Sequence, residues 1–103
     1  MRVRLFSNGI ESFVSPFVNR FTGNVCLAVA SSLKAPQPAK QLRYDFGKDA
    51  VELQIDGVTV PLDKSQGFAQ VIVCDTLRGM IHHLKGVDPE GSVRIEVEIE
   101  GQP

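Results

Sequence analysis

The chain lacks an excess of either charge and lacks any long hydrophobic run. Its 11 Lys and Arg residues are balanced by 12 Asp and Glu residues, which gives a formal net charge of −1 at pH 7. No stretch approaches the roughly 20 apolar residues of a membrane-spanning helix. Nucleic acid and anionic membranes both attract concentrated positive charge, so neither is an expected partner. The segment Met1 to Phe6 lacks the apolar core of a signal peptide, which favours a cytoplasmic location.

Motifs of the common cofactor, metal and nucleophile sites are also missing. The sequence contains no glycine-rich phosphate loop, no paired metal-ligand spacing and no Gly-x-Ser-x-Gly turn. Cys26 and Cys74 stand among apolar neighbours, so we expect buried, reduced thiols rather than nucleophiles or a disulfide. The sequence therefore predicts no cofactor, no metal and no catalytic residue, although it leaves open whether the protein has an enzymatic activity.

What the sequence does contain is the pattern of one small domain over residues 1–103, 43% of them hydrophobic. The pairs Asn8-Gly9 and Asp56-Gly57 each separate two short apolar runs, which predicts two β-hairpins with type I′ turns. Apolar residues alternate with polar ones over 41–46 and again over 93–99, so each range predicts a further strand.

The first helix is expected to begin at Ser15-Pro16, because Ser caps free backbone N–H groups and Pro suits the first helical position. Gly23-Asn24 should weaken the middle of this helix and kink or split it. The side expected to face the core carries apolar residues at steps of four: Phe17, Phe21, Val25 and Val29.

The second helix is expected over residues 67–85, where apolar residues recur at helical spacing. Gly86 is the expected left-handed residue at its end. Ala28 and Gly79 take equivalent places in the two helices, so we expect them to let the helices approach closely.

The predicted order is strand-strand-helix-strand, twice. It indicates an α+β fold, a two-layer sandwich with two helices on one face of a mostly antiparallel sheet. The core of that order is the ferredoxin-like split βαβ-βαβ arrangement with an extra hairpin strand in each half. A shift of 51 residues also aligns Phe17 with Phe68 and Arg43 with Arg94. The halves 1–51 and 52–102 are therefore candidates for an internal duplication, although any two such units share turn and cap residues for physical reasons.

A polar ridge on the second helix is one candidate ligand-binding site. Asp75, Arg78 and His82 share one helical face, and His83 follows them near the helix end. There the helix dipole favours a protonated histidine. The ridge is a candidate for binding anions or transferring protons, while the simpler interpretation is a solvated helix face.

The face of the sheet away from the helices is the second candidate, as a partner-binding surface. It is expected to carry charges of both signs, from Arg43, Asp45, Arg94, Glu96 and Glu98. Tyr44 should lie on the opposite, core face with Leu42, which leaves the open face without the aromatic residues that bind single-stranded nucleic acid.

The function expected from the sequence is a small non-catalytic binding or assembly module, which associates with a second copy as a homodimer or with a protein partner. The alternative is a small-molecule-binding or catalytic domain that uses the ridge on the second helix.

Overall fold

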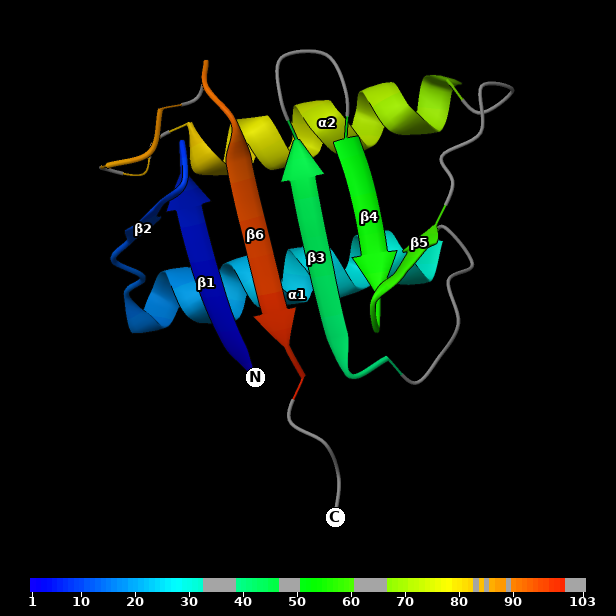
Figure 1. Ribbon diagram of the computed structural model, residues 1–103, viewed down its shortest axis with the longest axis horizontal. Coiled ribbons are helices and arrows are strands. Elements are labelled where there is room, and N and C mark those ends of the chain that lie inside the picture. The colour runs from blue at the N-terminus through cyan, green and yellow to red at the C-terminus, as the bar shows by residue number, and fades with distance from the viewer. Residues whose placement is uncertain are drawn as a thin grey trace.

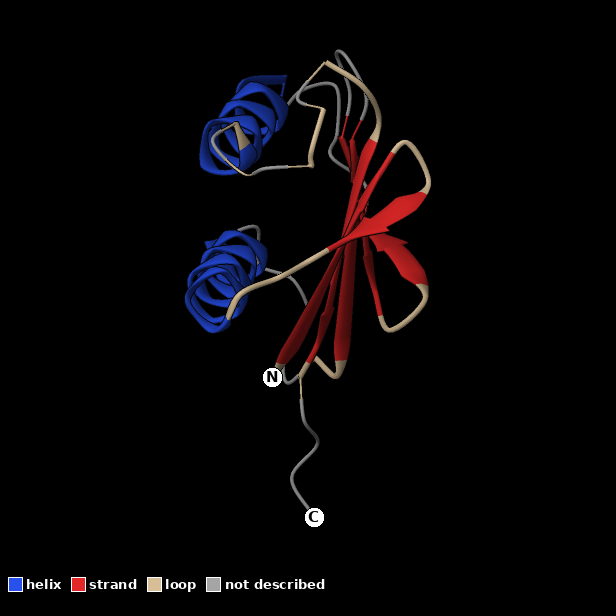
Figure 2. Ribbon diagram, turned by 90° about the vertical axis from the view of Figure 1, so that its left-hand side faces the viewer, coloured by secondary structure: helices blue, strands red, loops and turns tan. Residues whose placement is uncertain are grey.

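The computed structural model describes residues 1–32, 39–46, 51–60, 67–82, 84, 86–88 and 90–99. Two helices lie side by side on one face of a six-stranded antiparallel sheet (Figures 1 and 2). This arrangement confirms the expected two-layer α+β sandwich. The elements follow one another as β1 (Arg2–Ser7), β2 (Ile10–Ser12), α1 (Pro16–Ser32), β3 (Gln41–Phe46), β4 (Val51–Ile55), β5 (Val58–Val60), α2 (Gly67–Ile81) and β6 (Val93–Glu98).

The strand order across the sheet is β2-β1-β6-β3-β4-β5. β6 lies between β1 and β3, and β3 lies between β6 and β4, with every neighbouring pair antiparallel. Each helix therefore follows a hairpin on one flank and leads into a strand at the centre of the sheet. The last strand of the chain is consequently one of the two most central strands.

Both predicted hairpin turns form for the expected stereochemical reason. Asn8 and Gly9 have φ of 50° and 84°, and Asp56 and Gly57 have φ of 51° and 83°. Positive φ at both central residues is what a type I′ turn requires, and it matches the twist of the flanking strands. β1 thus pairs with β2, and β4 with β5.

The first residue of each turn also forms hydrogen bonds at the beginning of a neighbouring strand, Asn8 with Ser92 just before β6 and Asp56 with Gln41 of β3. The Asn8 amide donates to the Ser92 carbonyl at 2.8 Å, and the Ser92 amide donates to Asn8 Oδ1 at 3.0 Å. Likewise the Asp56 amide donates to the Gln41 carbonyl at 2.9 Å, and the Gln41 amide donates to Asp56 Oδ1 at 2.8 Å. The same pair of hydrogen bonds therefore occurs twice, each time joining the hairpin turn of one half to the other half.

Helix α1 begins as expected. Ser15 Oγ accepts a hydrogen bond from the Val18 amide at 3.2 Å, and Pro16 is the first helical residue. The expected split at Gly23-Asn24 was wrong, because α1 runs without interruption from Pro16 to Ser32. Gly23 is buried, and a methyl group there would overlap the side chain of Met1. Close packing against the first residue of the chain therefore accounts for the glycine.

The predicted core side of α1 was also wrong. The helix faces the sheet with small residues, Thr22, Gly23, Cys26 and Ala30. Phe17 and Phe21 are instead 64% and 48% exposed. Side chains four residues apart differ by about 40° in direction around the helix axis. A line of residues spaced by four therefore winds slowly around the helix. Phe17 lies opposite Cys26, and only the later members of the stripe reach the side of the helix.

Two expectations for the helices also fail. Ala28 and Gly79 are exposed, and a methyl group on Gly79 would meet nothing within 4 Å. These small residues therefore do not mediate a helix-helix contact. The last helical residue of α2 is Ile81, short of the expected end at residue 85. Gly86 has φ of 82° but lies in the turn after the helix, so it is not the cap of α2.

The core lies between the sheet and the helices. Tyr44 and Leu42 are fully buried, as expected. The Tyr44 hydroxyl donates to the carbonyl of Cys26 at 2.5 Å, which joins β3 to α1. Cys26 and Cys74 are both buried and free. The strands contribute most of the buried apolar residues, namely Val3, Leu5, Leu42, Tyr44, Val51, Leu53, Ile55, Val93, Ile95 and Val97.

The two halves correspond strand by strand. The sheet keeps its strand order if the labels of the two halves are exchanged, β1 with β4, β2 with β5 and β3 with β6, and the strands are then counted from the opposite edge. The registers agree as well. In the two hairpins, Leu5 pairs with Ser12 and, at the matching place, Leu53 pairs with Val60. Where each hairpin meets a central strand, Val3 pairs with Val97 and Val51 pairs with Phe46. The sheet therefore has approximate two-fold symmetry about an axis between β3 and β6.

Candidate functional site

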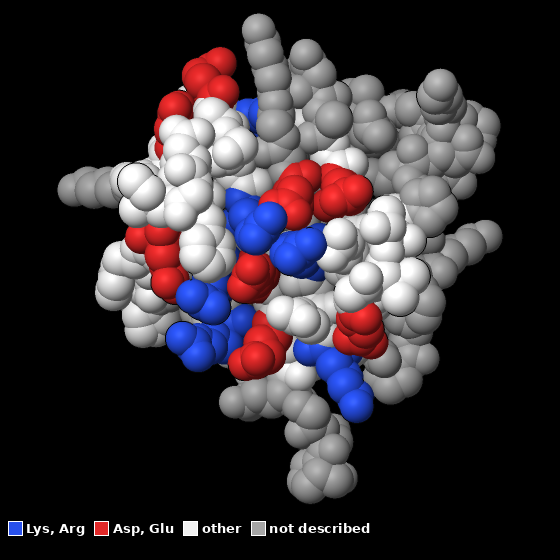
Figure 3. Space-filling view, viewed as in Figure 1, with Lys and Arg blue, Asp and Glu red and all other residues white. Residues whose placement is uncertain are grey.

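The outer face of the sheet, away from both helices, carries side chains of both charges. Figure 3 shows Lys and Arg intermingled with Asp and Glu over the centre of this face. The pattern follows from strand alternation, since β3 and β6 place one residue in two on each side. Arg43, Asp45, Arg94 and Glu96 all lie on the outer side, as the sequence predicted.

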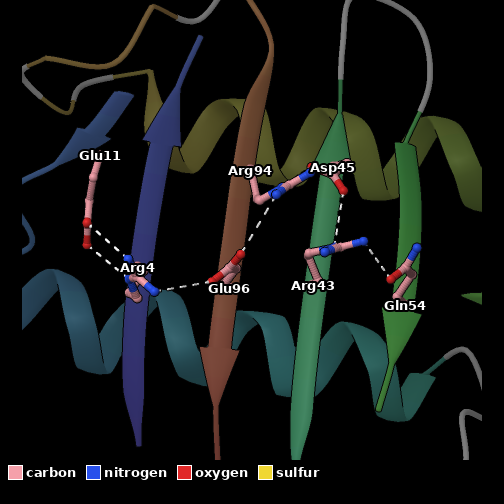
Figure 4. Close-up of polar contacts among 7 residues, drawn as sticks. All are labelled: Arg4, Glu11, Arg43, Asp45, Gln54, Arg94 and Glu96. Carbon is pink, nitrogen blue, oxygen red and sulfur yellow. Dashed lines mark hydrogen bonds and ion pairs between the residues drawn. The ribbon is translucent and has the colours of Figure 1, made fainter. Parts of the chain in front are cut away.

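These four residues form a charge square across the two central strands. Arg43 is directly opposite Glu96, and Asp45 is directly opposite Arg94. The Arg94 guanidinium donates from Nε to Asp45 Oδ1 at 2.6 Å, while its Nη1 lies 4.0 Å from Glu96 Oε2. Arg43 Nε lies 3.5 Å from Asp45 Oδ2. Figure 4 shows the two arginines and two acids alternating around this square.

Three further residues extend the charge square to its flanks, and sequence reasoning missed them. Arg4 of β1 donates from Nε and Nη2 to the two carboxylate oxygens of Glu11, both at 3.1 Å. Arg4 Nη1 also lies 3.8 Å from Glu96 Oε1. On the other side, Arg43 Nη2 donates to Gln54 Oε1 at 2.7 Å. Alternation along β1 and β4 places Arg4 and Gln54 on one face of each strand, but their contacts with the charge square depend on the strand order.

Hydrogen bonds on this face shift the pKa values of three of its groups. The hydrogen bond from Arg94 to Asp45 raises the pKa of the Arg94 guanidinium. In the same way the hydrogen bond with Glu11 raises the pKa of Arg4, and the bond from Arg4 lowers the pKa of the Glu11 carboxyl. These hydrogen bonds therefore favour the charged forms of Arg4, Glu11 and Arg94.

One donor in the charge square is incompletely satisfied. Arg43 Nε is shielded from solvent and makes no hydrogen bond, although the Asp45 carboxylate is near it. Glu98 lies beyond the square, opposite Arg2 on β1 and Gln41 on β3. It lines a shallow depression in the same face with Arg2, Arg4, Gln41 and Glu96. The structure therefore groups four of the five predicted partner-binding residues and places Glu98 beside them.

A second, more open depression lies along the part of β1 that β2 does not cover. It is lined by Arg2, Val3, Arg4 and residues 11–14. The Asn19 side chain of α1 occupies two backbone groups at this edge. Its Oδ1 accepts a hydrogen bond from the Val3 amide at 2.7 Å, and its Nδ2 donates one to the Met1 carbonyl at 3.2 Å. The exposed edge of β1 is thus capped by a side chain and is a poor template for adding another strand.

The structure describes three of the four residues of the predicted ridge on α2. Asp75 and His82 are exposed, and His82 belongs to the turn that follows the helix. Arg78 lies between them and is half-buried, with Nε and Nη2 shielded from solvent. His83 lies outside the described residues. The expectation that these four residues bind a ligand thus remains a prediction.

Within the described ranges, no three His, Cys, Asp or Glu side chains are grouped so as to hold a metal ion. Among the same residues, no helix is long and apolar enough to cross a membrane.

Comparison with known proteins adds no assignment. No protein-family model, no curated protein and no solved structure matches this chain.

Proposed function

We propose that this chain is a small non-catalytic binding or assembly module, which uses the outer face of its sheet to contact a second copy or a protein partner. The observation that carries the proposal is the charge square on β3 and β6 with its extensions to Arg4, Glu11 and Gln54. Both helices lie on the other face, so among the described residues no helix covers this one (Figure 2).

The geometry suits recognition because the charged side chains are already held in place. Arg94 and Arg4 are each fixed by hydrogen bonds to a carboxylate. Side chains that are ordered before binding lose less conformational entropy when a partner docks. Charges of both signs in a fixed pattern favour one partner and repel those of a different pattern. The face therefore combines a low cost of ordering with a means of discrimination.

Photo-crosslinking in the protein's native cells tests this proposal for either kind of partner. A photo-reactive phenylalanine analogue replaces Gln54, beside the charge square, and in a matched control it replaces Thr76, which is exposed on α2. We expect crosslinks from position 54 to a second copy or to one main protein, and background only from position 76. Equal background at both positions would contradict the proposal.

We further propose that the two halves arose by duplication of one strand-strand-helix-strand unit. The matched hydrogen bonds of Asn8 with Ser92 and of Asp56 with Gln41 support it, as do the matching registers of the two hairpins. Asn8 and Asp56 are 48 residues apart, whereas Gln41 and Ser92 are 51 apart. Three additional residues between the second hairpin and its following strand account for the difference. This proposal keeps one feature of the expected ferredoxin-like arrangement, namely that strands of the two halves interleave in one sheet.

A further inference from the structure

The charges of the outer face alternate in a way that makes the face complementary to itself. In the charge square, Arg43 and Arg94 stand at two opposite corners, and Asp45 and Glu96 stand at the other two (Figure 4). A two-fold axis in the interface, parallel to the strands and between β3 and β6, would place β3 of one copy over β6 of the other. Each arginine of the square then faces a carboxylate of the other copy.

The rows of side chains around the square follow the same rule. The strand registers place the outward residues of β1, β6, β3 and β4 in rows across the sheet. Within each row the axis exchanges β1 with β4 as well as β6 with β3. The facing pairs between copies are Arg43 with Glu96, Arg94 with Asp45, Arg4 with Gln54, Glu98 with Gln41 and Phe6 with Glu52. Across these four strands, therefore, no two like charges meet.

Other orientations match the charges less well. An axis along a diagonal of the square would place arginine over arginine, and it would cross the strands at nearly right angles. An axis across the strands pairs opposite charges within the square, but it leaves the row of Gln41 and Glu98 facing no strand of the other copy. The axis parallel to the strands keeps all strand directions aligned, as in common face-to-face packing of sheets.

We infer that the partner of the outer face is a second copy of this chain, bound face to face about a two-fold axis parallel to β3 and β6. The inference rests on the proposed function and names its partner. An interface of this symmetry must be complementary to itself. A second copy carries the matching pattern by identity, whereas any other protein would need the same alternation at the same spacing.

The arginines of the square have N–H groups left for a second copy. A guanidinium has five N–H groups. Among the described residues, Arg94 directs Nε at Asp45 and Nη1 at Glu96, which leaves Nη2 for a carboxylate of the other copy. Arg94 is also exposed, so a contact across the interface requires no rearrangement of the sheet.

The two hairpins leave room for this pairing. In Figures 1 and 2 the turn between β1 and β2 and the turn between β4 and β5 both rise on the side of the sheet away from the helices, at diagonally opposite corners. The axis parallel to the strands places the turns of the second copy at the other two corners. The four turns therefore surround the facing squares without meeting.

The size of the face indicates a weak, reversible dimer. Strands lie about 4.8 Å apart and rise about 3.4 Å per residue, so four neighbouring strands of about six residues cover roughly 400 Å² on each copy. A stable interface buries about 800 Å² on each partner. We therefore expect a Kd on the order of micromolar or above, which increases with salt because the contacts are ionic.

Fluorescence anisotropy of the full chain tests the inference. Fluorescein is attached at Thr76→Cys, which is exposed on α2 in the opposite layer, while the chain's own thiols are buried. The probe of the square is an inverted variant with Arg43→Glu, Asp45→Arg, Arg94→Glu and Glu96→Arg. It keeps the net charge and every opposite-charge pair within the square, and circular dichroism checks that it is folded.

Both squares are complementary to themselves but not to each other. We expect wild type to bind wild type, and inverted variant to bind inverted variant, with Kd values that agree to within about threefold. The mixed pair places like charges over one another, so it should bind at least about 10-fold more weakly. A mixed pair as tight as the matched pairs, or a folded inverted variant that does not self-associate, would overturn the inference. So would a wild type that stays monomeric up to about 1 mM.

Crosslinking at position 54 separates this inference from the proposed function. The axis places residue 54 over β1 of the second copy, so in a mixture of isotope-labelled and unlabelled protein the crosslink should join two copies and map near Arg4. A crosslink to β4 of the second copy would reject this axis. In cells, a crosslink to a different protein without self-association would reject the second copy and leave the proposed function standing. Background crosslinking without self-association would reject both.

Discussion

Cys26 and Tyr44 form a hydrogen-bonded pair inside the core. The Tyr44 hydroxyl donates to the Cys26 carbonyl, and both residues are fully buried. Burial disfavours the charged form of each group. It raises the pKa of the Cys26 thiol from 9.0 to about 12, and it raises the pKa of the Tyr44 phenol as well. Cys26 is therefore a structural residue, and its thiol is not expected to react while the protein is folded.

This burial predicts a specific loss of stability in alkaline solution. The unfolded chain releases the Cys26 proton near pH 9.0, whereas the folded protein holds it until about pH 12. The stabilising contribution is therefore complete below pH 9.0 and is lost as the pH rises towards 12. We expect the free energy of unfolding to fall by on the order of 4 kcal/mol from this residue alone.

Urea unfolding of the wild type and of Cys26→Ala, measured across this pH range, checks the prediction. The variant lacks the buried thiol, so its stability should decline less steeply although other groups still titrate. Parallel pH profiles for the two proteins would show that Cys26 is not the cause.

At the scale of single elements, two helical glycines have opposite surroundings. Gly79 of α2 is exposed and has open space around it, whereas Gly23 of α1 is buried against Met1. Glycine costs an ordinary helix roughly 1 kcal/mol relative to alanine. Only Gly23 offsets this cost, by admitting a neighbouring side chain.

The two substitutions to alanine should therefore have opposite signs. We expect Gly79→Ala to increase the free energy of unfolding by about 0.5–1 kcal/mol. Gly23→Ala should decrease it by about 1–3 kcal/mol, because the added methyl group must displace the Met1 side chain. Chemical denaturation measures both, and each variant is the control for the other. A stabilised Gly23→Ala variant would mean that Met1 does not hold its observed place.

At the scale of the whole molecule, the approximate two-fold symmetry distributes the core between two equivalent hairpins. Leu5 on β1 and Leu53 on β4 occupy matching places, and they are 1% and 0% exposed. Each lies one strand away from the central pair of β6 and β3. Their environments should be energetically alike if the halves derive from one unit.

Substituting each of these leucines tests the equivalence. Leu5→Ala and Leu53→Ala should each lower the free energy of unfolding by about 2–5 kcal/mol, and the two losses should agree to within about 1 kcal/mol. Equilibrium denaturation of both variants at one pH gives the comparison. A loss confined to one of them would indicate that a single half carries the stability of the fold.

The sequence alone determined the elements whose signals are local. Positive φ at Asn8-Gly9 and Asp56-Gly57 follows from residue type, and the helix start at Ser15-Pro16 follows from capping chemistry. Alternation in β3 and β6 likewise fixed which residues face the helices and which form the charged outer face. These features depend on neighbours in sequence, and so they could be predicted without coordinates.

The tertiary structure alone decided how those elements meet. The stripe of Phe17, Phe21, Val25 and Val29 indicated the wrong side of α1, because close approach to the sheet favours the small residues Thr22, Gly23, Cys26 and Ala30. The contacts of Arg4 and Gln54 with the charge square depend on strand order, and an antiparallel sheet permits many orders with the same local pattern. Local sequence specifies conformation, whereas packing between distant segments selects which faces remain exposed.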